Sequence, residues 1–143
     1  MNNFQIAALP HLEACAIIND MAKAPTAAEK DRMDRLSRSG CVVCRISHGS
    51  YVDGEIQHLT AGGRRLGHRY TICLCAWHHR SVPAGSVSPA EMRRIYGPSF
   101  AESRKEFEAS FGSEEHLLDE TDKWLGVPKV KRDVVDNDPK AAD

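Results

Sequence analysis

The sequence is organised around residues 41–80, CVVCRISHGSYVDGEIQHLTAGGRRLGHRYTICLCAWHHR. This stretch holds four of the chain's five cysteines, five of its seven histidines and a loop of glycine and arginine. Its five arginines are opposed by only Asp53 and Glu55, which leaves a local formal charge of +3 in a chain whose net charge is −1. A positive centre in a nearly neutral chain is compatible with a phosphate-binding site, although three charges also gather by chance on ordinary surfaces.

Two short motifs in this stretch have the spacing of metal ligands. Cys41-x2-Cys44 is followed, 31 residues after Cys44, by Cys75-x2-His78. Zinc takes four soft or borderline ligands in a tetrahedron, and two such pairs can supply them across a loop. We therefore predict a structural zinc site made of these four residues. A redox dithiol at Cys41 and Cys44 is the alternative, but it leaves the repeated spacing unexplained.

Neighbouring residues leave further alternatives open at this site. His48, in the turn expected after the first pair, is a second candidate for the fourth ligand in place of His78. Cys73 precedes Cys75 by two residues on an expected strand, so both would face the same side. Cys73 then either competes for zinc or packs beneath the site. Trp77 is expected to pack on the zinc site, with stacking on DNA as the alternative.

The chain around these motifs predicts a helix followed by short strands. Thr26-Ala27-Ala28-Glu29 has the form of a capping box, and Gly40 can end the helix that follows. Residues 49–63 and 70–75 favour strands and turns, because short apolar runs alternate there with glycine, aspartate and threonine. Residues 75–81 predict a helix that is cut short before a proline.

Further helices are predicted on both sides of this region. Apolar spacing favours a short helix over 11–23. Capping residues, apolar periodicity and terminal glycines predict helices over 88–97, 98–112 and 113–126, and three phenylalanines of the second should face the core. The polar segment that begins at Pro128 has neither a cap nor a periodic face, so we expect a disordered tail.

The length of the chain and its cysteines limit the class of protein. A chain of 143 residues suits one domain with a modest core. No apolar run is long enough to cross a bilayer, and the N-terminus has no basic start followed by an uninterrupted apolar segment. We therefore expect a cytoplasmic protein without a membrane partner. In a reducing compartment, closely spaced cysteines are more often metal ligands or redox pairs than disulfides.

Two histidines outside the predicted zinc site, His58 and His79, are candidates for catalysis. His79 follows a zinc ligand by one residue and points about 100° away around the short helix. His58 ends the first expected strand, so a strand, a loop, a strand and a helix can bring both rings to one cleft. Phosphodiester hydrolysis needs a base to activate water and a cation to neutralise the phosphorane, and such a pair meets both needs. Between them, Gly62-Gly63-Arg64-Arg65 offers amides and guanidinium groups for a DNA phosphate.

The chain resembles the HNH endonucleases of the phage recombination-enhancement type, which include a RecA-dependent DNA nuclease. The resemblance is carried by CVVC, IQHLTAGGRRLGHRYTICLCAWHHR and GPSFAESRKEFEASFGSEEHLLDETDKWL, and it covers about residues 40–125. The pattern HLTxGGxRxGHxxTIxLCxWHH is specific. The resemblance implies a ββα-metal active site built on a structural zinc, with His58 as general base and His79 as a ligand of a catalytic divalent ion.

The sequence departs from the general HNH pattern at two positions. The residue before the base, commonly an aspartate or histidine that binds metal, is Gln57, whose amide oxygen is a weaker and neutral ligand. The middle asparagine, which usually orients the base, falls at Tyr70. His68 has two possible roles. It either replaces one of these groups, as a metal ligand or as a residue that contacts a ligand, or it is purely structural.

Together these observations predict a small α+β domain with a zinc-stapled HNH (ββα-metal) core and flanking N- and C-terminal helices. We expect an N-terminal helical segment over 1–39, a nuclease domain with C-terminal helices over 40–127, and a disordered tail over 128–143.

The predicted function is metal-dependent DNA hydrolysis in phage recombination, inside a bacterial or phage-infected cell, with direction by a RecA-type filament as an added hypothesis. Catalysis is assigned to His58, His79 and His68, and the catalytic Mg²⁺ or Mn²⁺ to His79 and Gln57. DNA binding is assigned to Arg64, Arg65, Arg69 and Arg80. A non-catalytic zinc module that binds DNA or a protein is the first alternative, and a thiol redox protein is the second.

Overall fold

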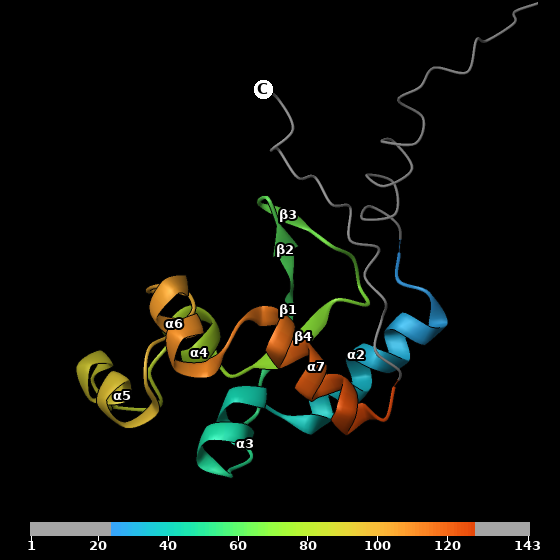
Figure 1. Ribbon diagram of the computed structural model, residues 1–143. Coiled ribbons are helices and arrows are strands. Elements are labelled where there is room, and N and C mark those ends of the chain that lie inside the picture. Colours follow the sequence, from blue (N-terminus) through green and yellow to red (C-terminus); the bar gives the residue numbers. More distant parts are fainter. Residues whose placement is uncertain (1–23, 128–143) are drawn as a thin grey trace, which may run out of the picture.

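The computed structural model describes residues 24–127 and combines helices with a small amount of strand (Figure 1). This mixture confirms the α+β class for the described part of the chain. The helix expected over 11–23 and the tail expected over 128–143 lie outside it. The elements are α2 (Ala27–Ser39), α3 (Val42–His48), β1 (Glu55–His58), β2 (Thr60–Ala61), β3 (Arg64–Arg65), β4 (Thr71–Leu74), α4 (Ala76–Arg80), α5 (Pro89–Tyr96), α6 (Arg104–Phe111) and α7 (Glu114–Leu125).

The described strands form two small antiparallel sheets, β1 with β4 and β2 with β3. In the first sheet Glu55 lies opposite Leu74, and the register runs on to the last residue of β1. The β2–β3 hairpin lies between β1 and β4 in sequence and projects away from the helices (Figure 1). Its turn consists of Gly62 and Gly63, at φ of 57° and 76°. Two successive residues of positive φ make the tight hairpin turn that glycine allows at little cost.

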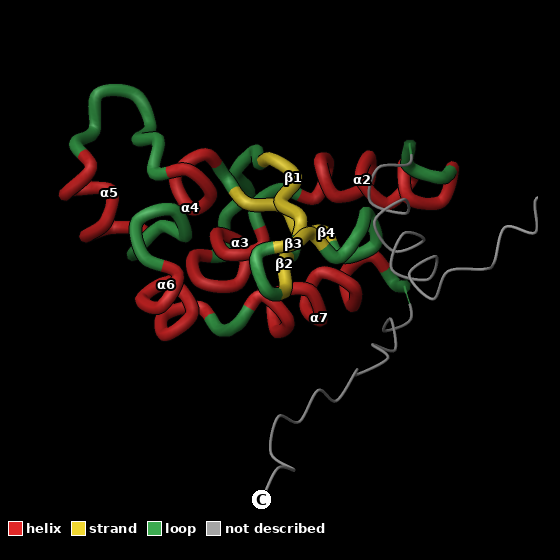
Figure 2. Tube along the Cα trace, turned by 90° about the horizontal axis from the view of Figure 1, so that it is seen from above, coloured by secondary structure: helices red, strands yellow, loops and turns green. Residues whose placement is uncertain are grey.

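Helices α2 and α7 contact β4 from opposite sides (Figure 2). Arg32 of α2 is buried between them and donates from Nη2 to the Thr71 carbonyl at 2.9 Å. Its Nη1 lies 2.7 Å from Oδ1 of the buried Asp122 in α7. An apolar cluster of Leu36, Cys73 and Leu125 joins the same elements. The strand that leads to α4 is therefore fixed on both faces.

Most helix boundaries confirm the predictions from local sequence. Thr26 and Glu29 form the capping box at the start of α2, which ends at Gly40. Ser88 caps α5 and Ser113 caps α7, each by accepting a backbone N–H three residues on. None of the helices in residues 24–127 is both long and apolar enough to span a bilayer.

Helix α3 replaces the turn that we expected after the first cysteine pair. Its N-cap is Cys41, whose Sγ accepts a hydrogen bond from the Cys44 N–H at 3.5 Å. Sulfur is a weak acceptor and is absent from the usual set of capping residues. This helix start therefore has no conventional sequence signal.

Helix α6 begins at Arg104, so the prediction that it starts at Pro98 was wrong. Ser99 is buried, and its Oγ accepts the Glu102 N–H at 3.2 Å, which holds the intervening residues in a turn. Ser103 is the N-cap that starts the helix. The aromatic side chains still pack on one core cluster as expected: Phe100, Phe107 and Phe111.

Candidate metal centre and active-site cleft

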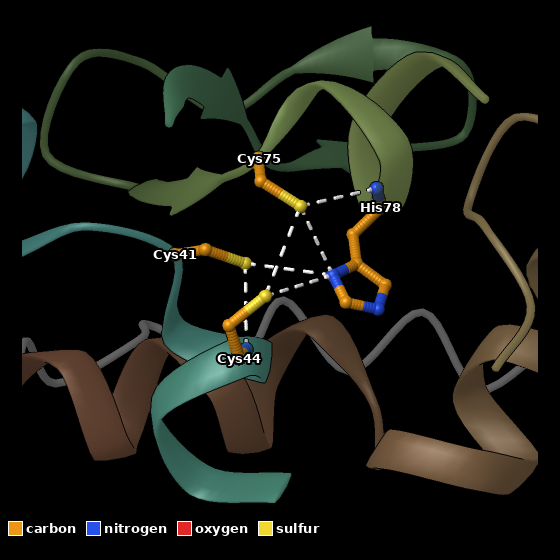
Figure 3. A group of neighbouring side chains, drawn as sticks. All are labelled: Cys41, Cys44, Cys75 and His78. Carbon is orange, nitrogen blue, oxygen red and sulfur yellow. Dashed lines mark hydrogen bonds between the residues drawn. The ribbon is translucent and has the colours of Figure 1, made fainter. Parts of the chain in front are cut away.

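Four buried side chains form a candidate metal site between the starts of α3 and α4 (Figure 3). Cys41 and Cys44 come from the start of α3, and Cys75 and His78 from the start of α4. Their ligand atoms all lie within 4.8 Å of one another. The structure thus brings together the two pairs on which the zinc prediction was based.

The distances within this quartet fit a zinc ion. Nδ1 of His78 lies 3.6 Å from Sγ of Cys41, 3.5 Å from that of Cys44 and 3.2 Å from that of Cys75. The sulfurs of Cys44 and Cys75 are 3.9 Å apart. Tetrahedral bonds of about 2.3 Å to sulfur and about 2.0 Å to nitrogen require about 3.5 Å between sulfur and nitrogen and about 3.8 Å between sulfurs. The four residues can therefore hold zinc with little movement.

The imidazole of His78 is oriented for this role by a backbone carbonyl. Its Nε2 lies 3.0 Å from the carbonyl oxygen of Tyr96, and the ring is fully buried. A carbonyl only accepts, so Nε2 carries the proton and Nδ1 presents its lone pair to the sulfurs. Ligating histidines commonly have such a partner, which fixes tautomer and ring orientation.

Contacts among the three cysteine side chains shift the pKa values of two of them. Hydrogen bonding with Cys41 and then with Cys75 raises the pKa of Cys44, whereas hydrogen bonding with Cys41 and then with Cys44 lowers the pKa of Cys75. A zinc ion would displace these protons and neutralise the resulting thiolates.

The alternative ligands lie elsewhere. His48 ends α3 and packs edge-on against the Tyr96 ring, with centroids 5.6 Å apart. Cys73 packs in the cluster on the α2 side, where burial raises the pKa of its thiol to about 12. It does not share a side with Cys75, because β4 ends at Leu74 and the alternation of side chains ends with it.

Trp77 is buried in the core cluster that includes the zinc-site cysteines. Its Nε1 donates to the Gly97 carbonyl at 3.0 Å. The expected packing role is therefore confirmed, and the buried ring offers no face to DNA.

A separate cleft of about 310 Å³ brings His58 and His79 together. It lies where β1, the β2–β3 hairpin, α4 and the start of α7 meet. Gln57 also lines it, whereas His68 reaches it only through a contact with His58. The lining residues are Ile56, Gln57, His58, Thr60, Arg65, His79, Phe100, Ala101 and Glu114.

His58 has the electrostatic environment of a neutral base. Burial, then the positive charge of Arg65, then His68 lower its pKa below the usual value of 6.5. Nε2 of His58 lies 3.1 Å from Nδ1 of His68, so one neutral ring donates to the other. This contact orients the His58 ring and leaves Nδ1 as its second nitrogen.

His79 is held by a carboxylate of the neighbouring strand. Its Nδ1 lies 2.8 Å from Oε2 of Glu55, the first residue of β1. Arg80 binds the same carboxylate, and Arg80 first, then His79, hold the pKa of Glu55 below its ordinary value. A carboxylate that accepts from one ring nitrogen orients a histidine to bind metal through the other. Sequence reasoning missed Glu55, although its place two residues before Gln57 on the same strand face was a signal.

The two residues that depart from the general HNH pattern, Gln57 and Tyr70, both have contacts within the fold. Gln57 is buried, and its Nε2 donates to Oε1 of Glu114 at 2.9 Å. Tyr70 is half-buried and packs against the core cluster on the zinc side. Glu114 was also missed, because no local pattern connects residues that are 57 positions apart.

The arginines proposed to bind DNA differ in their surroundings. Arg64 and Arg65 are exposed on the β2–β3 hairpin, and neither has a carboxylate partner within residues 24–127. Arg69 lies 3.9 Å from Glu29, while Arg80 is engaged by Glu55. The hairpin pair is therefore the most available positive charge beside the cleft.

The fold and both sites lie within a region that matches a known family. A family model described as "Recombination enhancement, RecA-dependent nuclease" matches residues 25–125. The matched region runs from just before α2 to the end of α7 and includes the cysteine–histidine quartet and the cleft. No curated protein matches the chain.

Proposed function

This chain belongs to the recombination-enhancement, RecA-dependent nuclease family, and from that premise we propose that it is an HNH endonuclease that hydrolyses DNA phosphodiester bonds. In this proposal β1, β4 and α4 form the ββα-metal core, and zinc joins the start of α3 to the start of α4. The observation that carries the proposal is that His58 and His79 line one cleft, each with the partner that its role requires.

The two histidines would divide the reaction between them. His58 takes a proton from the attacking water, and His68 positions its ring by the contact between them. His79 and the amide oxygen of Gln57 would hold a divalent ion, Mg²⁺ or Mn²⁺. When bound, that ion supplies positive charge to neutralise the phosphorane and the leaving 3′ oxygen.

DNA would approach over the β2–β3 hairpin. Arg64 and Arg65 are exposed there, and Arg65 also lines the cleft, so both can contact phosphates next to the scissile bond. Arg69 and Arg80 would add contacts at either side. We further propose that a RecA filament presents the DNA, and that residues 40–127 form the nuclease domain, preceded by a helical segment over 1–39.

The proposal is tested by incubating the zinc-loaded full chain with supercoiled plasmid and with single-stranded DNA. Each substrate is tested with Mg²⁺, with Mn²⁺ and with neither, in the presence and absence of RecA filaments. We expect cleavage that requires the divalent ion while the zinc content stays constant. DNA that is bound but never cut under any of these conditions would contradict the proposal and favour a non-catalytic zinc module.

A further inference from the structure

Glu114 is a buried carboxylate in the wall of the cleft. It is the first residue of α7, lines the cleft with His58 and His79, and is only 4% exposed. A buried negative charge is costly unless hydrogen bonds and counter-charges compensate it. Each of its oxygens has one donor: Nε2 of Gln57 lies 2.9 Å from Oε1, and Nη2 of Arg104 lies 2.9 Å from Oε2.

These contacts determine which way the Gln57 amide is turned. A carboxylate paired with an arginine only accepts hydrogen bonds, so Gln57 must present its NH₂ group to Glu114. The carbonyl oxygen, Oε1, is then directed away from Glu114. It is buried, the residue is only 6% exposed, and no described residue donates to it. A buried acceptor without a hydrogen-bond donor is uncommon, so we expect this oxygen to bind a further group.

We propose that Glu114 is a positioning residue for the divalent ion of the cleft. It holds Gln57 so that Oε1 serves, with His79, as a ligand of a hard cation such as Mg²⁺ or Mn²⁺. It also supplies a negative charge close to a ligand that is itself neutral. Both Glu114 oxygens are already engaged, so the carboxylate acts through Gln57. This inference rests on the proposed function, since it assigns a role within the same site.

The test is a titration of the zinc-loaded full chain with Mn²⁺, in which electron paramagnetic resonance measures the free ion. Substitution of a residue that orients a metal ligand typically weakens metal binding about 10- to 100-fold. We expect a loss of this size for Glu114→Ala, with the zinc content unchanged. Glu115→Ala is the matched control, because Glu115 is an exposed acid in the same first turn of α7.

A reciprocal substitution separates positioning from simple packing. In the double variant Gln57→Glu/Glu114→Gln, the amide introduced at position 114 would donate to the carboxylate introduced at position 57 and accept from Arg104. Every hydrogen bond is then retained, and a carboxylate replaces the neutral ligand. We expect this double variant to bind Mn²⁺ at least as tightly as wild type. If Glu114→Ala does not fold, Glu114→Gln takes its place, with the same expected direction.

Two outcomes would overturn the inference: Mn²⁺ affinity within twofold of wild type in the folded single variant Glu114→Ala or Glu114→Gln, or a double variant no better than Glu114→Ala. These measurements distinguish failure of the inference from failure of the proposed function. If wild-type protein cuts DNA but substitution of Glu114 leaves the Mn²⁺ affinity unchanged, only the inference is contradicted. If wild-type protein never cuts DNA, but Mn²⁺ binding is weakened by Glu114→Ala and recovers in the double variant, only the proposed nuclease activity is contradicted.

Discussion

His58 and His79 differ in the partner of each ring, and this difference separates their proposed roles. His58 is partly buried, lies near the positive charge of Arg65 and contacts another imidazole, so protonation is disfavoured and the neutral ring is available as a base. His79 contacts the carboxylate of Glu55, which orients it and leaves its second nitrogen for a cation.

The lowered pKa of His58 predicts the pH profile of cleavage. Only the neutral ring accepts a proton from water, so the rate should rise with pH through the pKa and level off above it. Because burial and nearby positive charge hold the pKa below 6.5, the midpoint of this rise should lie below pH 6.5. Single-turnover rates at saturating Mg²⁺ across pH 5–8 measure this profile.

Arg65→Ala should move the midpoint of that profile to higher pH, because it removes a positive charge that lowers the pKa. Arg64→Ala is the control, since Arg64 is the adjacent exposed residue and does not contribute to this shift. Equal midpoints in the two variants would contradict the assignment of His58 as the titrating base.

Local spacing predicted the candidate metal ligands, because two residues that are three positions apart in a short turn are held at a fixed distance. The same logic could not find Glu114, whose contact with Gln57 spans 57 positions and depends on where α7 packs. It chose Cys75 but left Cys73 open as a competitor for zinc, because excluding Cys73 requires knowing where β4 ends. The roles of His58, His68, His79 and Gln57 stay predictions that await the experiments above.

At the scale of elements, Arg32 connects α2 to β4 and α7 from within the core. It donates to Thr71 and forms a buried ion pair with Asp122. Removing one partner leaves the other charge buried and uncompensated. This network therefore holds the strand that leads to α4 and the cleft.

We expect Asp122→Ala to lower the free energy of unfolding by about 3–5 kcal/mol, the usual cost of breaking a buried ion pair. Urea denaturation of the zinc-loaded protein measures it. Asp31→Ala is the control, because Asp31 pairs with Arg35 on the surface of α2, and it should cost less than about 1 kcal/mol. Equal losses in both variants would show that the network has no special role.

Element boundaries could be predicted where a conventional cap marks them. Thr26, Ser88 and Ser113 are such caps, and their helices begin as expected. The start of α3 is capped by a cysteine sulfur, and α6 begins later than expected because Ser99 holds a turn before the N-cap Ser103. Cysteine is not a usual capping residue, and the sequence before Ser103 offered an earlier start at Pro98, so these two boundaries were not predicted.

The β2–β3 hairpin predicts a change in the salt dependence of DNA binding. Removing one phosphate-binding charge from a complex with duplex DNA reduces the slope of log K against log salt concentration by about 0.9. We expect this reduction for Arg64→Ala and for Arg65→Ala, measured by fluorescence anisotropy over a range of salt concentrations. Arg94→Ala, on the exposed face of α5, should leave the slope unchanged.

At the scale of the whole molecule, the cysteine–histidine quartet joins two segments that are 31 residues apart around the main core cluster. A structural zinc site typically contributes about 10–16 kcal/mol, as much as the whole stability of many domains. Removal of zinc should therefore unfold the described region, whereas omission of Mg²⁺ should not.

Thermal unfolding followed by circular dichroism tests this difference. Zinc-stripped protein and Cys44→Ser should both lose the cooperative transition, and added zinc should restore it only in the stripped wild type. A cooperative transition of unchanged midpoint after zinc loss would contradict a structural metal at this site.

The assignment of His58 as the general base is tested by the rate of DNA cleavage, measured for wild-type protein and for His58→Ala at equal zinc content and equal DNA affinity. His116→Ala, an exposed histidine of α7, is the control. Loss of general base catalysis typically costs about 10²- to 10⁴-fold in rate. We predict a loss in this range for His58→Ala alone. A cleavage rate of His58→Ala equal to that of wild type would contradict the assignment of this cleft as the catalytic centre.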